Sequence, residues 1–207
     1  MPHEHSGDGP APNPHADHPG FHGVGGLIAA LSMLRGRGPM ARLAIELTGA
    51  QRREDVADVG CGPGVAARLA ASAGMNVTGI DPADVMLWVA RLLDRRGRVT
   101  WKTGYAEHLP LPDGAADVVW VLSTIHHVPD VERALAEARR VLRLGGRFVA
   151  IERKTVPGAT GLASHGWLPE QAEALADLVR AGGFVDVSAV ERVLPRGPVL
   201  AVAAHRG

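Results

Sequence analysis

Short apolar runs alternate with longer amphipathic stretches along most of the chain. Near-continuous apolar runs such as "DVVWVL" (residues 117–122) are typical of central strands covered on both faces. This pattern predicts strands over residues 55–60, 76–81, 99–104, 116–122, 147–152, 184–194 and 199–205, and helices over 64–74, 83–96, 130–143 and 169–182. Strands that alternate with helices at this spacing predict a parallel sheet with right-handed crossovers.

The last two predicted strands are an exception to the parallel arrangement. They are joined by "PRGP" (residues 195–198), which is too short for a crossover helix, so they must form an antiparallel hairpin. In "RVLRLGGRFVAIE" we expect the helix to end at Gly145–Gly146 and a buried strand to follow. The expected fold is therefore α/β, a Rossmann-like doubly wound seven-stranded sheet, mostly parallel with an antiparallel C-terminal hairpin.

The N-terminal residues have a different pattern. Residues 1–22 are rich in proline and histidine with few apolar side chains, which predicts a flexible tail. The histidine spacing there matches no closed metal site, so we predict no metal site. Residues 23–50 then show helical spacing in "GLIAALSML" and "GPMARLAIELTGA", which predicts two helices separated by "RGRG". Residues 51–207 form the main domain.

Composition and charge narrow the class of protein. The 207 residues carry 22 basic and 22 acidic side chains, and this balance argues against a nucleic-acid surface. The single cysteine, Cys61, excludes an intramolecular disulfide and fits a reducing compartment. No apolar run is long enough for a membrane span, and no signal-peptide pattern occurs at the N-terminus. We therefore expect a soluble, cytoplasmic protein with no membrane partner.

A glycine-rich loop follows the first strand of the main domain. "DVADVGCGPGVAARLAA" (residues 55–71) places Gly60, Gly62 and Gly64 between that strand and a helix. Asp81 ends the next strand, at the spacing where a carboxylate reaches the hydroxyls of a ribose bound over the loop. Ligands of open parallel sheets bind at the carboxyl ends of the strands. The loop and Asp81 together predict a ligand that contains a nucleoside.

The glycine loop also has alternative interpretations. A dinucleotide loop, as in a redox enzyme, needs glycine or alanine at its sixth position, where this chain has the β-branched Val65. Pro63 also lacks an N–H that a pyrophosphate would use. A Walker loop is excluded because no Lys-Ser/Thr pair follows the glycines. A tight turn that binds no ligand is the remaining structural alternative.

Several stretches resemble class I S-adenosylmethionine (SAM)-dependent methyltransferases of the UbiE-like, small-molecule type. "VADVGCGPGVAARLA" resembles their first motif, and "VTGIDPADVMLWVA" resembles their second strand with its ribose-binding acid. "GYAEHLPLPDGAADVVWVLSTIHHVPDVERALAEARRVLRLGGRFVAIE" resembles the stretch that follows. The resemblance covers about residues 52–153. It implies SAM as cofactor and a small molecule as methyl acceptor.

The resemblance also assigns roles to individual residues. The glycines would approach the methionyl part of SAM, Asp58 would orient that part, and Asp81 would bind both ribose hydroxyls. Cys61 is expected to be a small residue under the cofactor, not a nucleophile or metal ligand. Tyr105 departs from the family, which has Asp or Asn there to accept the adenine amino group. The implied cofactor-binding residues are Asp58, Gly60, Cys61, Gly62, Gly64, Asp81, Pro82, Ala106, Glu107 and Ser123.

A base is needed only where the methyl acceptor must lose a proton. His126 is the first candidate and His127 the second, because "STIHHV" (residues 123–128) follows a strand at the carboxyl edge of the sheet. The alternative is that the histidine pair only lines the cofactor pocket. The other candidates are His22, His165 and Glu152. Among the tryptophans, Trp88, Trp101 and Trp120 are expected in the core, and Trp167 is a candidate substrate contact.

The expected function is methyl transfer from SAM to a small molecule by in-line displacement. The alternative is a non-catalytic protein of the same fold that binds SAM or S-adenosylhomocysteine in a regulatory or assembly role. The linker between residues 153 and 168 is short, so the helices within 23–50 are expected to form the substrate lid, with residues 18–26 as its hinge. A short lid leaves room for a homodimer whose second subunit completes the pocket.

Overall fold

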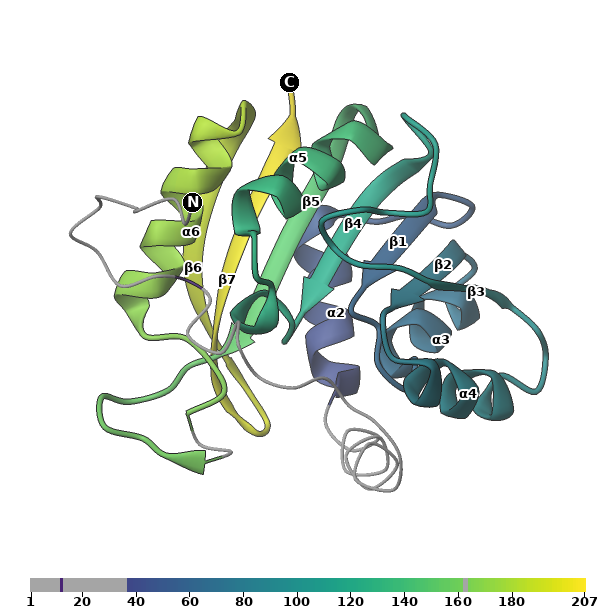
Figure 1. The fold of residues 1–207 in the computed structure, drawn as a ribbon, viewed down its shortest axis with the longest axis horizontal. Helices are drawn as coiled ribbons and strands as arrows, with labels where there is room; N and C mark the ends of the chain where they lie inside the picture. Colours follow the sequence, from purple (N-terminus) through teal and green to yellow (C-terminus); the bar gives the residue numbers. More distant parts are fainter. Residues whose placement is uncertain (1–11, 13–36, 162–163) are drawn as a thin grey trace.

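The computed structural model describes residue 12, residues 37–161 and residues 164–207, and its centre is one seven-stranded sheet (Figure 1). The strand order is β3-β2-β1-β4-β5-β7-β6, with parallel pairing from β3 to β5 and antiparallel pairing of β7 with β5 and β6. The strands are β1 Asp55–Val59, β2 Asn76–Asp81, β3 Val99–Thr103, β4 Ala116–Leu122, β5 Leu142–Arg153, β6 Phe184–Leu194 and β7 Gly197–Arg206. The predicted fold class, including the C-terminal hairpin, is confirmed.

Helices cover both faces of the sheet. The helical elements are α2 Arg37–Thr48, α3 Val65–Ser72, α4 Asp84–Leu93, the 3-10 turn η1 Ile125–His127, α5 Val131–Val141 and α6 Pro169–Ala181. The helices α2, α3 and α4 pack on one face, whereas α5 and α6 pack on the other (Figure 1). Alternate residues of β1 and β4, such as Val118 and Val119, enter the two separate apolar clusters beneath these helices. Within the described part of the chain, no helix is long and apolar enough to cross a membrane.

The junction between α5 and β5 differs from the prediction. The helix ends at Val141, and the fully buried Leu142 already pairs with Ala116 of β4. Regular pairing resumes only at Arg147, so the residues between form a bulge, with Gly145 in the left-handed region at φ 72°. The expected helix end at Gly145–Gly146 was therefore wrong, because burying Leu142 in the sheet replaces the last helical turn.

The tryptophans divide differently from the expectation. Trp120 is fully buried, as predicted, and Trp101 is partly buried beside the glycine loop. Trp88 lies on the outer side of α4 with 57% of its surface exposed, so its placement in the core was wrong. Trp167 is fully buried in the cluster beneath α5 and α6, where it cannot contact a substrate directly.

The second of the two predicted N-terminal helices corresponds to α2. Its residues Met40, Leu43 and Ala44 are buried against α3, β4 and β5, so α2 belongs to the same core as the sheet. The predicted flexible tail over 1–22, the hinge over 18–26 and the first predicted helix lie outside the described residues, apart from Pro12. The division of the chain at residues 22 and 50 stays a prediction.

Candidate functional site

The glycine loop connects β1 to α3 at the carboxyl edge of the sheet. The N–H groups of Gly60 and Cys61 both donate to the carbonyl oxygen of Ile80 in β2, at 2.8 and 3.0 Å. Gly60, Gly62 and Gly64 have φ values of 69°, 53° and 73°. This left-handed conformation strains any residue with a Cβ, which explains the repeated glycine.

Two of these glycines also make room for protein side chains. A Cβ atom on Gly60 would lie 2.2 Å from Cγ2 of Thr124, and one on Gly64 would lie 2.2 Å from Cη2 of Trp101. The hydroxyl of Thr124, which precedes η1, is 3.2 Å from the carbonyl oxygen of Gly60 and donates to it. The sequence pattern did not reveal this packing role, since Trp101 lies in β3 and Thr124 follows β4, both distant in sequence from the loop.

Replacing Gly60 by alanine tests this packing role against backbone strain. Gly49 is a matched control, because it has φ 60° but open space around its missing Cβ. We expect Gly49→Ala to lose about 1–2 kcal/mol of unfolding free energy from backbone strain alone. Gly60→Ala should lose about 1–3 kcal/mol more from the clash with Thr124. Equal losses in urea unfolding would show that the contact with Thr124 does not constrain the loop.

Asp81 ends β2 and holds the glycine loop in place. Its Oδ2 accepts a hydrogen bond from the Gly62 N–H at 2.8 Å, and its Oδ1 accepts one from the Ala83 N–H at 2.9 Å. The side chain is buried, which raises its pKa, while the two N–H donors act in the opposite direction. Each carboxylate oxygen accepts one bond from the backbone and has capacity for another from a ligand hydroxyl.

Asp58 lies in β1 below the loop and is almost fully buried. Burial raises the pKa of its carboxyl to about 7, although the charge of Arg37 and a hydrogen bond from the Ala67 N–H lower it. Oδ2 of Asp58 has no hydrogen-bond partner among the described residues. A buried, unpaired carboxyl oxygen next to a glycine loop fits a site for a polar or cationic ligand group.

Arg37 is a site residue that sequence reasoning missed. It begins α2, and its Nη1 donates to the carbonyl oxygen of Leu122 at the end of β4. From there its positive charge acts on the carboxyls of both Asp58 and Asp81. In the sequence, "RGRG" is only a break between two helical patterns, and nothing local places it beside the glycine loop.

The raised pKa of Asp58 predicts a pH dependence of stability. Between the ordinary value of 3.8 and the folded value of about 7, the folded state binds more protons than the unfolded state. The unfolding free energy is therefore expected to fall as the pH rises through this window and to level off above it. Asp58→Asn should remove this decline and stabilise the protein at pH 8 relative to wild type. Urea unfolding of both proteins at pH 5 and pH 8 measures it, and a pH-independent difference would contradict it.

The remaining predicted cofactor-binding residues have distinct surroundings. Cys61 is buried, and burial together with the carboxylates of Asp58 and Asp81 raises the pKa of its thiol, which therefore stays protonated. Pro82 is exposed at the start of the loop into α4. The Ser123 N–H donates to the Ile151 carbonyl oxygen at 2.8 Å, with Ser123 at φ 51°.

Ala106 and Glu107 follow β3 in a turn closed by a bridge between Tyr105 and His108. Ala106 packs against the apolar cluster beneath α5 and α6. A carboxylate oxygen of Glu107 accepts a bond from the Asp130 N–H at 3.4 Å, next to the start of α5. Tyr105 is largely exposed, at 62%.

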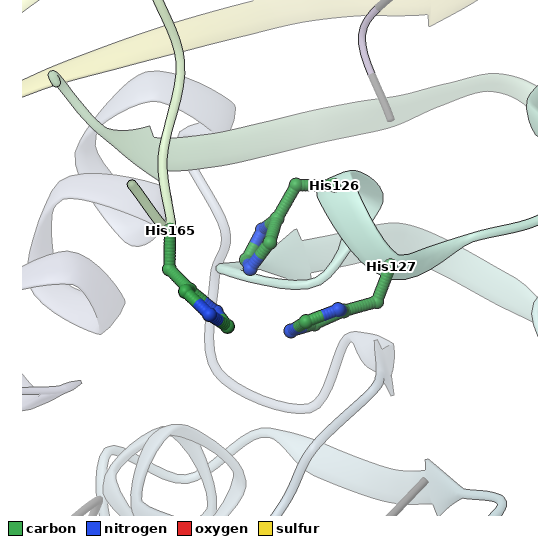
Figure 2. Close-up of side chains that lie close together, drawn as sticks. All are labelled: His126, His127 and His165. Atoms are coloured by element: carbon green, nitrogen blue, oxygen red, sulfur yellow. The ribbon is translucent and has the colours of Figure 1, made fainter. Parts of the chain in front are cut away.

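A histidine cluster is formed by His126, His127 and His165 (Figure 2). His126 and His127 belong to η1, and their ring centroids are 4.0 Å apart. His165 comes from the segment between β5 and α6, with its ring centroid 5.5 Å from that of His126 and 5.2 Å from that of His127. Two residues that the sequence offered only as separate candidates, His165 and Glu152, are thus gathered around His126.

Glu152 supports the cluster from below. Its side chain, on β5, is fully buried, and its Oε1 is 2.9 Å from Nδ1 of the buried His126. The carboxylate of Glu152 therefore lies directly beside the imidazole of His126. The other ring nitrogen, Nε2, then lies on the far side of the ring from Glu152. The fifth candidate base, His22, lies outside the described residues.

Comparisons with known proteins agree with this geometry. Residues 57–150 match the family described as "Methyltransferase domain". Over 109 residues the chain is 47% identical to the ubiquinone/menaquinone biosynthesis C-methyltransferase UbiE of Methylobacterium nodulans, covering 49% of this chain and 43% of that protein. It is 39% identical over 112 residues to the 27-O-demethylrifamycin SV methyltransferase of Amycolatopsis mediterranei, covering 51% of this chain and 40% of that protein.

The fold is also similar to a solved methyltransferase structure. Haemonchus contortus phosphoethanolamine N-methyltransferase 2, in complex with phosphomonomethylethanolamine and S-adenosylhomocysteine, superposes with a TM-score of 0.72 at 18% identity. The superposition covers 87% of this chain and 57% of that one. The alignments span less than half the length of the two curated relatives. Residues 57–150 therefore form a methyltransferase domain, and in sequence and in its sheet the chain is similar to class I SAM-dependent methyltransferases of the UbiE-like type.

Proposed function

We propose that this protein transfers a methyl group from SAM to a small-molecule acceptor. The observation that carries the proposal is the continuous carboxyl edge from Asp81 through the glycine loop to His126. Asp81 bonds to the loop at Gly62, and Gly60 bonds to Thr124, two residues before His126. A nucleoside held at one end of this edge would present its sulfonium close to the other.

The residues around the loop fit the polar groups of SAM. Asp81 would accept bonds from the ribose hydroxyls, and the unpaired oxygen of Asp58 would face the cationic methionyl end. Arg37 would attract the methionyl carboxylate, because its charge already acts on this site. Pro82, Ala83, Ala106 and Glu107 would border the adenine, and Ser123 would lie near the sulfonium. SAM, once bound, supplies an activated methyl group.

The chemistry that remains for the chain is alignment and proton removal. Methyl transfer from a sulfonium is an in-line displacement, so an acceptor must be held on the axis of the breaking bond. At Nε2, His126 would take the proton that the methyl acceptor loses. Glu152, beside Nδ1, would stabilise the resulting imidazolium. His127 and His165 would border the acceptor. An acceptor with an acidic hydroxyl or an activated carbon, as the names of the two curated relatives suggest, would suit this arrangement.

Binding and turnover are tested separately. Tritiated SAM should bind the full chain in equilibrium dialysis, and label should pass to at least one member of a panel of quinols, phenols and amines. SAM carrying a chiral methyl group should give product with inverted configuration if the displacement is in line. Binding without any transfer would favour the alternative, a non-catalytic SAM-binding protein. We also propose that the protein works in a reducing cytoplasm and binds no nucleic acid. A homodimer whose second subunit completes the pocket is a further proposal.

The helices predicted within residues 23–50 are proposed to form a lid, with residues 18–26 as its hinge. The Trp167 Nε1–H donates to the carbonyl oxygen of Pro12 at 2.8 Å, so Pro12 contacts the residue two positions after His165. Deleting residues 1–25 is expected to leave SAM affinity within about threefold and to abolish turnover, because gating segments affect catalysis more than cofactor binding. Full activity of the shortened chain in the label-transfer assay would contradict the lid.

A further inference from the structure

We propose that His126, His127 and His165 form a binding site for a divalent transition-metal ion of the zinc type. Each residue offers one imidazole nitrogen, and these three nitrogens lie within 4.8 Å of one another. The rings converge on one space from two different segments of the chain (Figure 2). Neutral imidazole is the ligand that zinc, nickel, cobalt and copper share, whereas magnesium and calcium prefer oxygen.

The geometry needs only a small closure to reach a metal site. With zinc–nitrogen bonds of about 2.0–2.1 Å, tetrahedral ligands are roughly 3.4 Å apart. The nitrogens of the cluster must therefore approach one another by at most about 1.4 Å, which is within the reach of side-chain rotation. His127 and His165 are only partly buried, whereas His126 is buried with its Nδ1 2.9 Å from Glu152. Three protein ligands leave a fourth position for water.

Glu152 gives His126 the surroundings of a metal ligand. Metal-binding histidines commonly place their second ring nitrogen against a carboxylate, which fixes the tautomer and orients the ring. Here Nδ1 of His126 is 2.9 Å from Oε1 of Glu152, and Glu152 is fully buried. With Nδ1 facing Glu152, Nε2 is the nitrogen of His126 that would bind the ion. The buried carboxylate also offsets part of the positive charge that an ion would bring into the site.

The segment that carries His165 is anchored to β5, so the third ligand is not on a loose loop. The Trp167 N–H donates to the Arg153 carbonyl oxygen at 2.8 Å, and Nη2 of Arg153 donates to the His165 carbonyl oxygen at 2.8 Å. Between them, a Cβ on Gly166 would lie 2.3 Å from the Arg153 carbonyl oxygen, so the backbones touch there. These contacts hold His165 opposite η1.

Occupation of the cluster has a consequence for catalysis that rests on the proposed function. An ion bound to Nε2 of His126 would occupy the lone pair that otherwise takes the proton from the methyl acceptor. Zinc is therefore expected to inhibit methyl transfer, and a chelator is expected to restore it. The binding site itself does not depend on this consequence.

The test uses the full chain with the five tail histidines, His3, His5, His15, His18 and His22, replaced by glutamine, because these would bind metal independently. Calorimetric titration with zinc chloride should give one ion per chain, and cobalt(II) should give the visible absorption of a four-coordinate site. His165→Gln should weaken zinc binding at least tenfold. Glu152→Gln should weaken it by about 10- to 100-fold, as for other supporting carboxylates. The exposed His205→Gln is the matched control and should leave the affinity unchanged.

Two results would overturn the proposal: no zinc binding by the tail-substituted chain, or equal affinity in His165→Gln and His205→Gln. Circular dichroism of each variant confirms that a loss of binding does not come from unfolding. The metal site and the proposed function fail separately. Zinc binding without any methyl transfer in chelator would keep the site and contradict the function, whereas transfer without zinc binding would do the reverse.

Discussion

Replacing Asp81 by asparagine is expected to weaken SAM binding by at least about 100-fold. Two hydrogen bonds from ribose hydroxyls to a carboxylate contribute on the order of 1.5 kcal/mol each or more, and every 1.4 kcal/mol is tenfold in affinity. The substitution has a second cost, since the carboxylate also accepts bonds from the Gly62 and Ala83 N–H groups. An amide nitrogen would face one of these donors and disturb the loop. Calorimetry with SAM gives the affinity directly.

A ligand variant separates the two effects of Asp81. S-adenosylhomocysteine and its 2′-deoxy analogue should differ in affinity for the wild type, but bind Asp81→Asn almost equally if the carboxylate contacts the ribose. Asp84→Asn is a matched control, because Asp84 is an exposed carboxylate three residues away that bonds only to the Thr103 hydroxyl among the described contacts. An unchanged preference for the ribose hydroxyl in Asp81→Asn would show that Asp81 only organises the loop.

The fold was predictable because its signals are local and repeated. Apolar strand patterns gave β2, β4 and β6 with the bounds that the structure has, and the short "PRGP" linker required the hairpin of β6 and β7. The junction at Leu142 was not predictable, because its helical pattern competes with pairing to Ala116, a residue distant in sequence. Trp88 could have been placed correctly from the sequence. Asp84 and Arg91 lie four residues before it and three after it, so helical spacing puts all three on the exposed face of α4.

The site was predictable only where a motif is contiguous. The glycine loop and Asp81 follow from spacing along the chain, and "STIHHV" identifies the histidine pair. Arg37, Glu152 and His165 reach the same region from α2, β5 and the segment after β5, so only the tertiary structure brings them there. This explains why the sequence treated His165 and Glu152 as two of several unconnected bases and gave Arg37 no role.

Replacing His126 by asparagine is expected to lower kcat by roughly 100- to 10,000-fold, the usual contribution of a positioned general base. The effect requires an acceptor that must lose a proton, such as a phenol or quinol. SAM affinity should change by less than about threefold, because the contacts of His126 described above are with Glu152 and the other histidines. Label-transfer kinetics in the presence of a chelator measure kcat without interference from bound metal.

Three companion variants make the result specific to proton transfer. His108→Asn, on an exposed histidine in the turn after β3, should leave kcat unchanged. Glu152→Gln keeps the shape of the side chain but removes the charge 2.9 Å from Nδ1, so it should lower kcat by about tenfold without affecting SAM binding. The double variant His126→Asn/Glu152→Gln should be no slower than His126→Asn alone, because Glu152 would act only through the histidine. A double variant that is slower by the product of the two single effects would mean that Glu152 and His126 act independently, and that the histidine is not the proton acceptor that the carboxylate supports.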